Sequence, residues 1–192
     1  EYNDPRLSRA FITKQGASGK EQAPGTADNA VYAPNGSPEQ GTSKYGTSLF
    51  MYSISAPTLL LSYHELKFLE AEALCRLGRD AKSALKDAVV AGLLNAENSF
   101  SVSRKELGKT LINPASSITD TEAESYFDNT IEAKYTAEPL KTTMIQKYFA
   151  LWGASGEATE SYNDVRRMKG LGENFIELKN PNSFPLRCPY GN

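Results

Sequence analysis

The sequence predicts a mainly α-helical protein with long irregular loops. Two capping-box patterns, Ser62 to Glu65 and Thr119 to Glu122, each precede apolar residues that recur at helical spacing. We find no alternation of strands and helices of the kind that builds a parallel sheet. Residues 1–60 hold 11 of the 24 glycine and proline residues. We therefore expect a loop-rich segment, residues 1–60, packed on an α-helical portion, residues 61–192, as one structural unit.

The first two predicted helices form a hairpin. Ser62 is placed to cap a helix that ends at Gly78, and the face that we expect to be buried comprises Tyr63, Leu66, Leu69, Ala73 and Leu77. Asp80 is placed to cap a second helix that ends at Gly92, and its expected buried face is Ala81, Ala84, Leu85, Ala88 and Val89. The turn between them is so short that the helices must pack antiparallel. This hairpin has the size of a tetratricopeptide unit, about 34 residues.

Further helices are predicted towards the C-terminus. A short helix is expected near residues 102–111, and a longer one from Thr119 to about Lys134. A helix beginning at Pro139 and ending at Gly153 has a wide apolar face: Leu140, Met144, Ile145, Tyr148, Leu151 and Trp152. We expect core packing for Trp152 and for Phe149 beside it. A last helix, residues 157–168, is expected to turn Tyr162, Val165 and Met168 inward.

Composition excludes several classes of function. The 192 residues carry 21 Lys and Arg against 23 Asp and Glu, and no basic run suited to nucleic acid is present. No apolar stretch approaches the roughly 20 residues that a membrane-spanning helix needs. Cys75 and Cys188 could pair only if their Cβ atoms came within about 4 Å, and a buried free thiol at Cys75 is the simpler interpretation.

Catalytic and metal sites find little support in the sequence. The single histidine, His64, lies in the first turn of a helix, so histidine-rich zinc sites and histidine-dependent triads lack residues. A pair of carboxylates for glycoside hydrolysis could come from Glu65, Glu70, Glu72, Glu157, Glu160 and Asp164, but spacing along the chain does not set their separation. We expect no catalytic residues, no bound metal and no cofactor.

Aromatic residues in the loop-rich segment are the best candidates for ligand contacts. Tyr32, Tyr45 and Tyr52 lie among glycine, serine and asparagine residues, where a polar loop does not need large rings for a core. Aromatic faces stack on apolar faces of ligands, and Asn35 can add a directional hydrogen bond. The alternative is that these rings, together with Phe50, fasten the loop to the helices.

Four segments, taken together, resemble the SusD/RagB family of outer-membrane nutrient-binding lipoproteins of Bacteroidetes. They are residues 59–73 (LLLSYHELKFLEAEA), 145–153 (IQKYFALWG), 160–167 (ESYNDVRR) and 184–190 (FPLRCPY). Their order and spacing agree with the family over residues 57–190. Members are two to three times longer, so the resemblance implies that this chain is the C-terminal portion.

The resemblance implies a non-catalytic protein of the bacterial cell surface, held at the outer membrane by a lipid anchor outside this chain. It would bind an oligosaccharide or other nutrient and deliver it to a SusC-like TonB-dependent outer-membrane transporter. No binding residue is carried over from the family, so Tyr32, Asn35, Tyr45 and Tyr52 remain predictions from composition. Two alternatives stay open: a tetratricopeptide-type scaffold that binds a peptide or partner protein, and glycoside hydrolysis.

Overall fold

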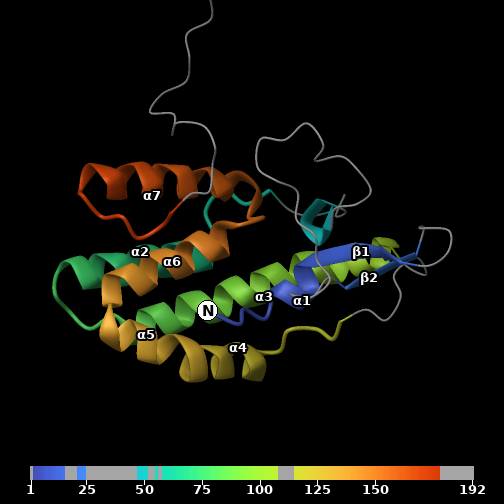
Figure 1. Ribbon diagram of the computed structural model, residues 1–192, viewed down its shortest axis with the longest axis horizontal. Helices are drawn as coiled ribbons and strands as arrows, with labels where there is room; N and C mark the ends of the chain where they lie inside the picture. The colour runs from blue at the N-terminus through green and yellow to red at the C-terminus, as the bar shows by residue number, and fades with distance from the viewer. Residues whose placement is uncertain are drawn as a thin grey trace, which may run out of the picture.

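The computed structural model describes residues 2–15, 21–24, 47–51, 55, 58–107 and 115–177. In this part of the chain, helices pack around α3 (Lys82–Leu107), which runs through the middle of the molecule (Figure 1). Helix α2 (Tyr63–Arg76) packs on both α3 and α6 (Pro139–Leu151), and α7 (Ala158–Gly170) packs on α6. The predicted mainly α-helical fold is confirmed.

The predicted hairpin is formed by α2 and α3. The Ser62 hydroxyl accepts a hydrogen bond from the Glu65 N–H at 3.1 Å, and Gly78 ends α2 with φ +67°. A left-handed residue here suits glycine, which has no Cβ to clash. The Asp80 carboxylate accepts from the Lys82 N–H at 3.0 Å. The expected core face of α3 is buried throughout: Ala81, Ala84, Leu85, Ala88 and Val89.

Helix α3 does not end at Gly92, as the sequence analysis expected, but runs on to Leu107, 26 residues in all, and absorbs much of the separate helix predicted at residues 102–111. Gly92 lies where α3 approaches α6, and a Cβ on it would come within 3.1 Å of the Ala150 Cβ. A glycine inside a helix costs about 1 kcal/mol relative to alanine. At this position it allows the two backbones to approach, so it marks a helix crossing.

The predicted buried face of α2 is also wrong. Its large members Tyr63, Leu66, Leu69 and Leu77 are 60%, 53%, 43% and 68% exposed, and Ala73 is exposed as well. The helix instead buries His64, Glu65, Phe68, Ala71 and Glu72. Apolar spacing identified a stripe on the helix but not the side that faces the core, because the polar residues of the other side find partners on distant elements.

A π-helical turn interrupts the helix predicted from Thr119 to Lys134. It separates α4 (Asp120–Tyr126) from α5 (Glu132–Ala137) and spans η4 (Phe127–Ile131). The Thr119 hydroxyl accepts from the Glu122 N–H at 3.2 Å, as the capping box predicts. Both ends of the π turn, Phe127 and Ile131, are fully buried.

In the last two helices, the predicted core residues Met144, Leu151, Val165 and Met168 are buried. Tyr162 is not turned inward as expected: it is 36% exposed, and the Arg166 guanidinium lies 5.5 Å from its ring centre. The rest of α6 buries polar residues as well, since α2, α3, α5 and α7 all pack on it.

The N-terminal segment contains strands that the sequence analysis did not predict. After α1 (Leu7–Ala10), strands β1 (Phe11–Gln15), β2 (Glu21–Pro24) and β3 (Thr47–Ser48) form an antiparallel sheet in the order β2-β1-β3. Ala10, Ile12 and Leu49 belong to the same hydrophobic core as the helices. The Ser103 hydroxyl of α3 donates to the Leu49 carbonyl at 2.6 Å, which fastens the segment to α3.

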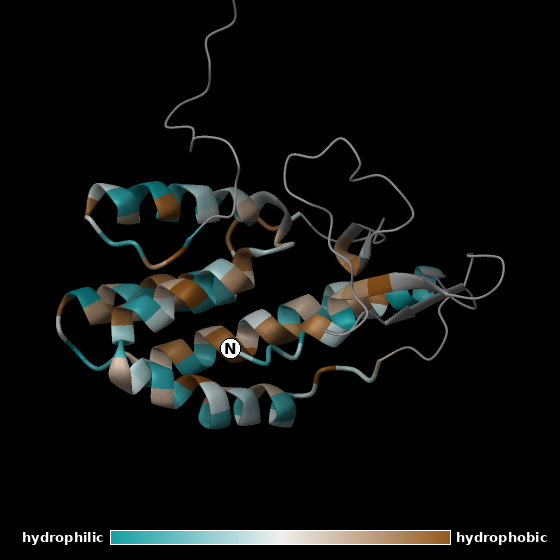
Figure 2. Cartoon of the chain, viewed as in Figure 1, coloured by the Kyte–Doolittle hydropathy of each residue, from teal (hydrophilic) through white to brown (hydrophobic). Residues whose placement is uncertain are grey.

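Hydropathy follows this arrangement. Figure 2 shows hydrophobic residues recurring along α3 and mostly hydrophilic residues on α4, at the edge of the molecule. None of the described helices is both long enough and apolar enough to span a bilayer.

Candidate ligand-binding site

A pocket lined by aromatic rings lies where the end of α6 meets the N-terminal segment. Its volume is about 490 Å³, within the range of small-molecule sites. The wall is formed by Tyr2, Asn3, Asp4, Arg6, Leu7, Phe11, Phe149 and Trp152. Residues that are more than 130 positions apart in the chain therefore build one concave surface.

The turn after α6 places Trp152 at the pocket. Trp152 leaves the helix with an extended backbone, φ −67° and ψ 121°, and Gly153 follows with φ +76°. A Cβ on Gly153 would overlap the Phe50 ring, so glycine lets that ring pack directly against the turn. The indole stacks on Phe11 with ring centres 5.1 Å apart, and meets the Phe50 ring edge-on at 5.0 Å. Trp152 remains 39% exposed, which leaves part of a rigidly held aromatic surface open.

A second pair of rings completes the aromatic wall. Tyr2 meets Phe149 edge-on, with ring centres 5.5 Å apart, and the Lys134 ammonium lies 4.9 Å from the centre of the Tyr2 ring. A tyrosine hydroxyl is protonated at neutral pH and can donate a hydrogen bond, and burial raises the pKa of the Tyr2 hydroxyl further.

The charged residues of the wall neutralise each other. Arg6 is only 5% exposed, and its guanidinium donates to both carboxylate oxygens of Asp4, at 2.9 and 2.6 Å. A third bond, at 2.7 Å, runs from Arg6 to the Phe149 carbonyl and ties the N-terminal segment to α6. Because Arg6 and Asp4 neutralise each other, the pocket suits a neutral ligand with apolar faces and a few hydroxyls, such as a sugar ring.

The predicted ligand residues Tyr32, Asn35, Tyr45 and Tyr52 lie outside the described residues, as does Cys188. Phe50, from the same group of aromatics, is described: it is half-buried between Trp152 and Phe100, with a 4.8 Å distance to the Phe100 ring centre. The sequence analysis assigned Trp152 and Phe149 to the core, whereas both line the pocket. One sequence signal could have indicated that Trp152 is partly exposed: it stands directly before Gly153, where the helix ends.

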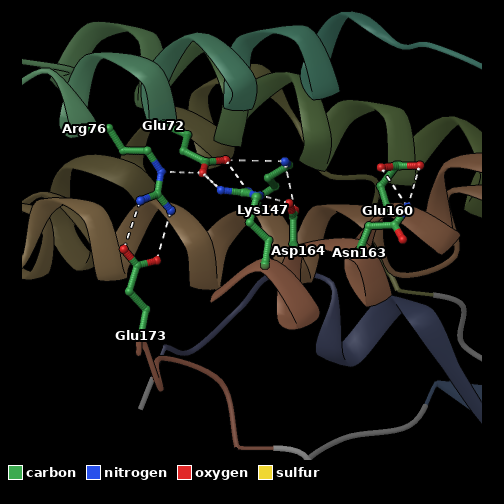
Figure 3. A network of polar contacts seen from close by, with 8 residues as sticks. Glu72, Arg76, Lys147, Glu160, Asn163, Asp164 and Glu173 are labelled. Atoms are coloured by element: carbon green, nitrogen blue, oxygen red, sulfur yellow. Dashed lines mark hydrogen bonds and ion pairs between the residues drawn. The ribbon is translucent and has the colours of Figure 1, made fainter. Parts of the chain in front are cut away.

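Several of the carboxylates considered for hydrolysis are held in a polar network between α2, α6 and α7 (Figure 3). Glu72 accepts from Arg76 at 2.8 Å and from both guanidinium nitrogens of Arg167. Asp164 accepts from Arg167 at 2.7 Å and pairs with the buried Lys147 ammonium at 2.8 Å. Burial alone would raise the pKa of Glu72, but the hydrogen bonds from Arg167 and Arg76 outweigh it, and the pKa lies below its ordinary value. These ion pairs hold α2, α6 and α7 together.

A second polar group lies buried beside η5 (Ser155–Glu157). His64 and Glu157 are both 2% exposed, with His64 Nε2 3.6 Å from a Glu157 carboxylate oxygen. Burial lowers the pKa of His64 despite that carboxylate, so the imidazole is neutral at pH 7. Burial and the neighbouring Glu157 raise the pKa of Glu65.

Within the described ranges, no three His, Cys, Asp and Glu side chains are grouped so that they could hold a metal ion. Cys75 is half-buried, with its Sγ 3.6 Å from the Thr143 hydroxyl.

Comparison with known proteins identifies the fold. No family model matches the sequence, and no curated protein matches it. Among solved structures, the crystal structure of a SusD/RagB family protein from Bacteroides thetaiotaomicron VPI-5482, at 1.75 Å resolution, superimposes with a TM-score of 0.92 and 63% sequence identity. That match covers 99% of this chain. The chain belongs to the SusD/RagB family. It spans 41% of the length of the solved relative.

Three of the four segments that carry the family resemblance lie on described helices of this SusD/RagB chain. Residues 59–73 cover most of α2, residues 145–153 cover the second half of α6 and the turn after it, and residues 160–167 lie in α7. The polar network of Glu72, Lys147, Asp164 and Arg167 joins all three. The SusD/RagB sequence pattern thus includes the ion pairs that join α2, α6 and α7.

Proposed function

We propose that this SusD/RagB chain is part of a non-catalytic cell-surface protein that binds an oligosaccharide or other nutrient. The protein, anchored at the outer membrane by lipid outside this chain, would deliver the ligand to a SusC-like TonB-dependent transporter. The observation that carries the proposal is the partly exposed indole of Trp152, held by Phe11 and Phe50 in the wall of a pocket of about 490 Å³. Sugar rings present apolar faces that stack on such a surface.

The polar groups near the pocket favour binding over catalysis. Asp4, the carboxylate of the pocket wall, is bound to Arg6 through both of its oxygens. A general acid or nucleophile for glycoside hydrolysis would need a carboxylate that reaches the scissile bond. We also retain Tyr32, Asn35, Tyr45 and Tyr52 as proposed contacts from the loop-rich segment.

Calorimetric titration of the chain with a panel of neutral oligosaccharides tests the proposal. Replacing Trp152 with alanine removes the stacking surface, worth about 1–1.5 kcal/mol, and should weaken binding about tenfold. Tyr162→Ala, which removes a partly exposed ring on α7 instead, is the matched control and should leave Kd unchanged. Binding that is equally tight in both variants would contradict the site, and turnover of a bound glycan would favour the hydrolase alternative.

A further inference from the structure

One residue of the aromatic pocket has an uncommon backbone conformation. Asn3, in the pocket wall, has φ +44°, and it is the one residue other than glycine with a positive φ in the described ranges. A left-handed backbone is unfavourable for most side chains with a Cβ, and asparagine tolerates it better than most. Such residues cluster at ligand sites, where the surrounding structure holds them in place.

Both neighbours of Asn3 are fixed to the end of α6. On one side, the Tyr2 ring meets Phe149 edge-on, with ring centres 5.5 Å apart. On the other side, Asp4 accepts from the Arg6 backbone N–H at 2.9 Å and from its guanidinium at 2.6 Å. Arg6 in turn donates to the Phe149 carbonyl at 2.7 Å. The chain therefore turns at an exposed Asn3 between two anchored residues, so its side chain can meet a ligand with little loss of conformational entropy.

Asn3 is also the only residue of the pocket wall with a side-chain amide. The charged side chains of the wall, Asp4 and Arg6, are bonded to each other, and most of the remaining wall is aromatic. An amide carries a carbonyl acceptor and an NH₂ donor side by side, without net charge. A sugar ring presents neighbouring hydroxyls, each of which donates and accepts. One amide can therefore bond two neighbouring hydroxyls at once, donating to one and accepting from the other.

We propose that Asn3 is a specificity-determining residue of the aromatic pocket and selects ligands with two neighbouring hydroxyls. This inference rests on the proposed function and adds a direction to it. Stacking on Trp152 fixes the plane of a bound sugar ring, whereas the Asn3 amide fixes how the ring is rotated within that plane. Asparagine suits this position because it combines tolerance of a positive φ with the amide, and glycine would supply the backbone conformation alone.

Two replacements of Asn3 separate the amide from the backbone. Asn3→Gly keeps the left-handed conformation but removes the amide, whereas Asn3→Ala removes the amide and also disfavours that conformation. Calorimetric titration uses the tightest-binding neutral oligosaccharide of the panel. Both variants should weaken its binding about tenfold, as expected for the loss of one or two hydrogen bonds. Asn3→Ala should lower the Tm more than Asn3→Gly does. Asn174→Gly, at an exposed asparagine after α7 that does not line the pocket, is the control and should leave Kd unchanged.

A second measurement tests the selectivity. Analogues of the same oligosaccharide, each lacking one hydroxyl, are titrated against the unmodified chain and Asn3→Gly. At least one analogue should bind the unmodified chain more weakly than the parent sugar, yet bind Asn3→Gly as tightly as the parent sugar does.

Two results would overturn the role of Asn3 alone, provided that Trp152→Ala still weakens binding. One is an unchanged Kd in Asn3→Gly, with or without a loss in Asn3→Ala, because Asn3 would then act only through its backbone. The other is a set of analogues that lose the same affinity for the unmodified chain and for Asn3→Gly. If no oligosaccharide of the panel bound the unmodified chain, both this inference and the proposed function would be wrong.

Discussion

Gly153, in the turn after α6, has a backbone angle that favours glycine and packs directly against the Phe50 ring. Replacing it with alanine therefore adds two costs, one from backbone strain and one from displaced packing. Its φ of +76° costs a residue with a Cβ about 1–2 kcal/mol. In addition, the new Cβ would overlap the Phe50 ring, and displacing a packed ring costs about 1–3 kcal/mol more. Gly153→Ala should therefore lower the free energy of unfolding by about 2–5 kcal/mol.

Gly172 is a matched control for this experiment. It has nearly the same backbone, φ +75°, but a Cβ there would meet no atom within 4 Å. Gly172→Ala should thus cost only the backbone part, about 1–2 kcal/mol. Urea unfolding measures both variants, and fluorescence of Trp152, the one tryptophan in the sequence, should change only in Gly153→Ala. Equal costs for the two variants would refute the packing argument.

The remaining predictions concern the buried polar groups. Glu72→Gln should lower the free energy of unfolding by about 3 kcal/mol at pH 7, since it weakens the bonds to Arg167 and leaves positive charge uncompensated. Glu138 forms an exposed ion pair with Lys141 and serves as the control. Glu138→Gln should cost about 0.5 kcal/mol or less by the same urea assay. Because the pKa of Glu65 is raised in the folded state, its favourable contribution is complete below pH 4.5 and is lost as the pH rises through the folded value. Glu65→Gln should therefore stabilise the protein more at pH 7 than at pH 4, and the opposite trend in urea unfolding would contradict this.

Local signals in the sequence predicted the helix ends well. Ser62, Thr119 and Gly78 act through hydrogen bonds or backbone angles within a few residues, so the pattern of neighbouring residues is sufficient. The same local reasoning misplaced the end of α3, because Gly92 is explained by Ala150, which lies far along the chain on α6.

The orientation of α2 depends on contacts that no local pattern contains. Glu72 is 95 residues away from Arg167, yet their ion pair helps to turn the polar side of α2 inward and the leucines outward. Periodicity identifies an apolar stripe, but the identity of its neighbour is a property of the tertiary fold. The spacing of apolar residues along a helix also does not show what those residues pack against.

The aromatic pocket also depends on contacts that local sequence patterns do not contain. Arg6 donates to the Phe149 carbonyl across 143 residues, and Trp152 stacks on Phe11 from a strand that the sequence analysis did not predict. Strands β2 and β3 are four and two residues long, so they carry little alternation. The prediction that aromatic side chains bind the ligand rests on composition, whereas the location of the pocket required the fold.

Calorimetric titration of the chain at two salt concentrations is the most direct test of ligand binding at the aromatic pocket. Because Asp4 and Arg6 neutralise each other, a neutral oligosaccharide should bind with a Kd that stays constant between 50 and 500 mM salt, and Trp152→Ala should weaken it about tenfold. No binding of any glycan, or binding that Trp152→Ala leaves intact, would contradict the proposed site.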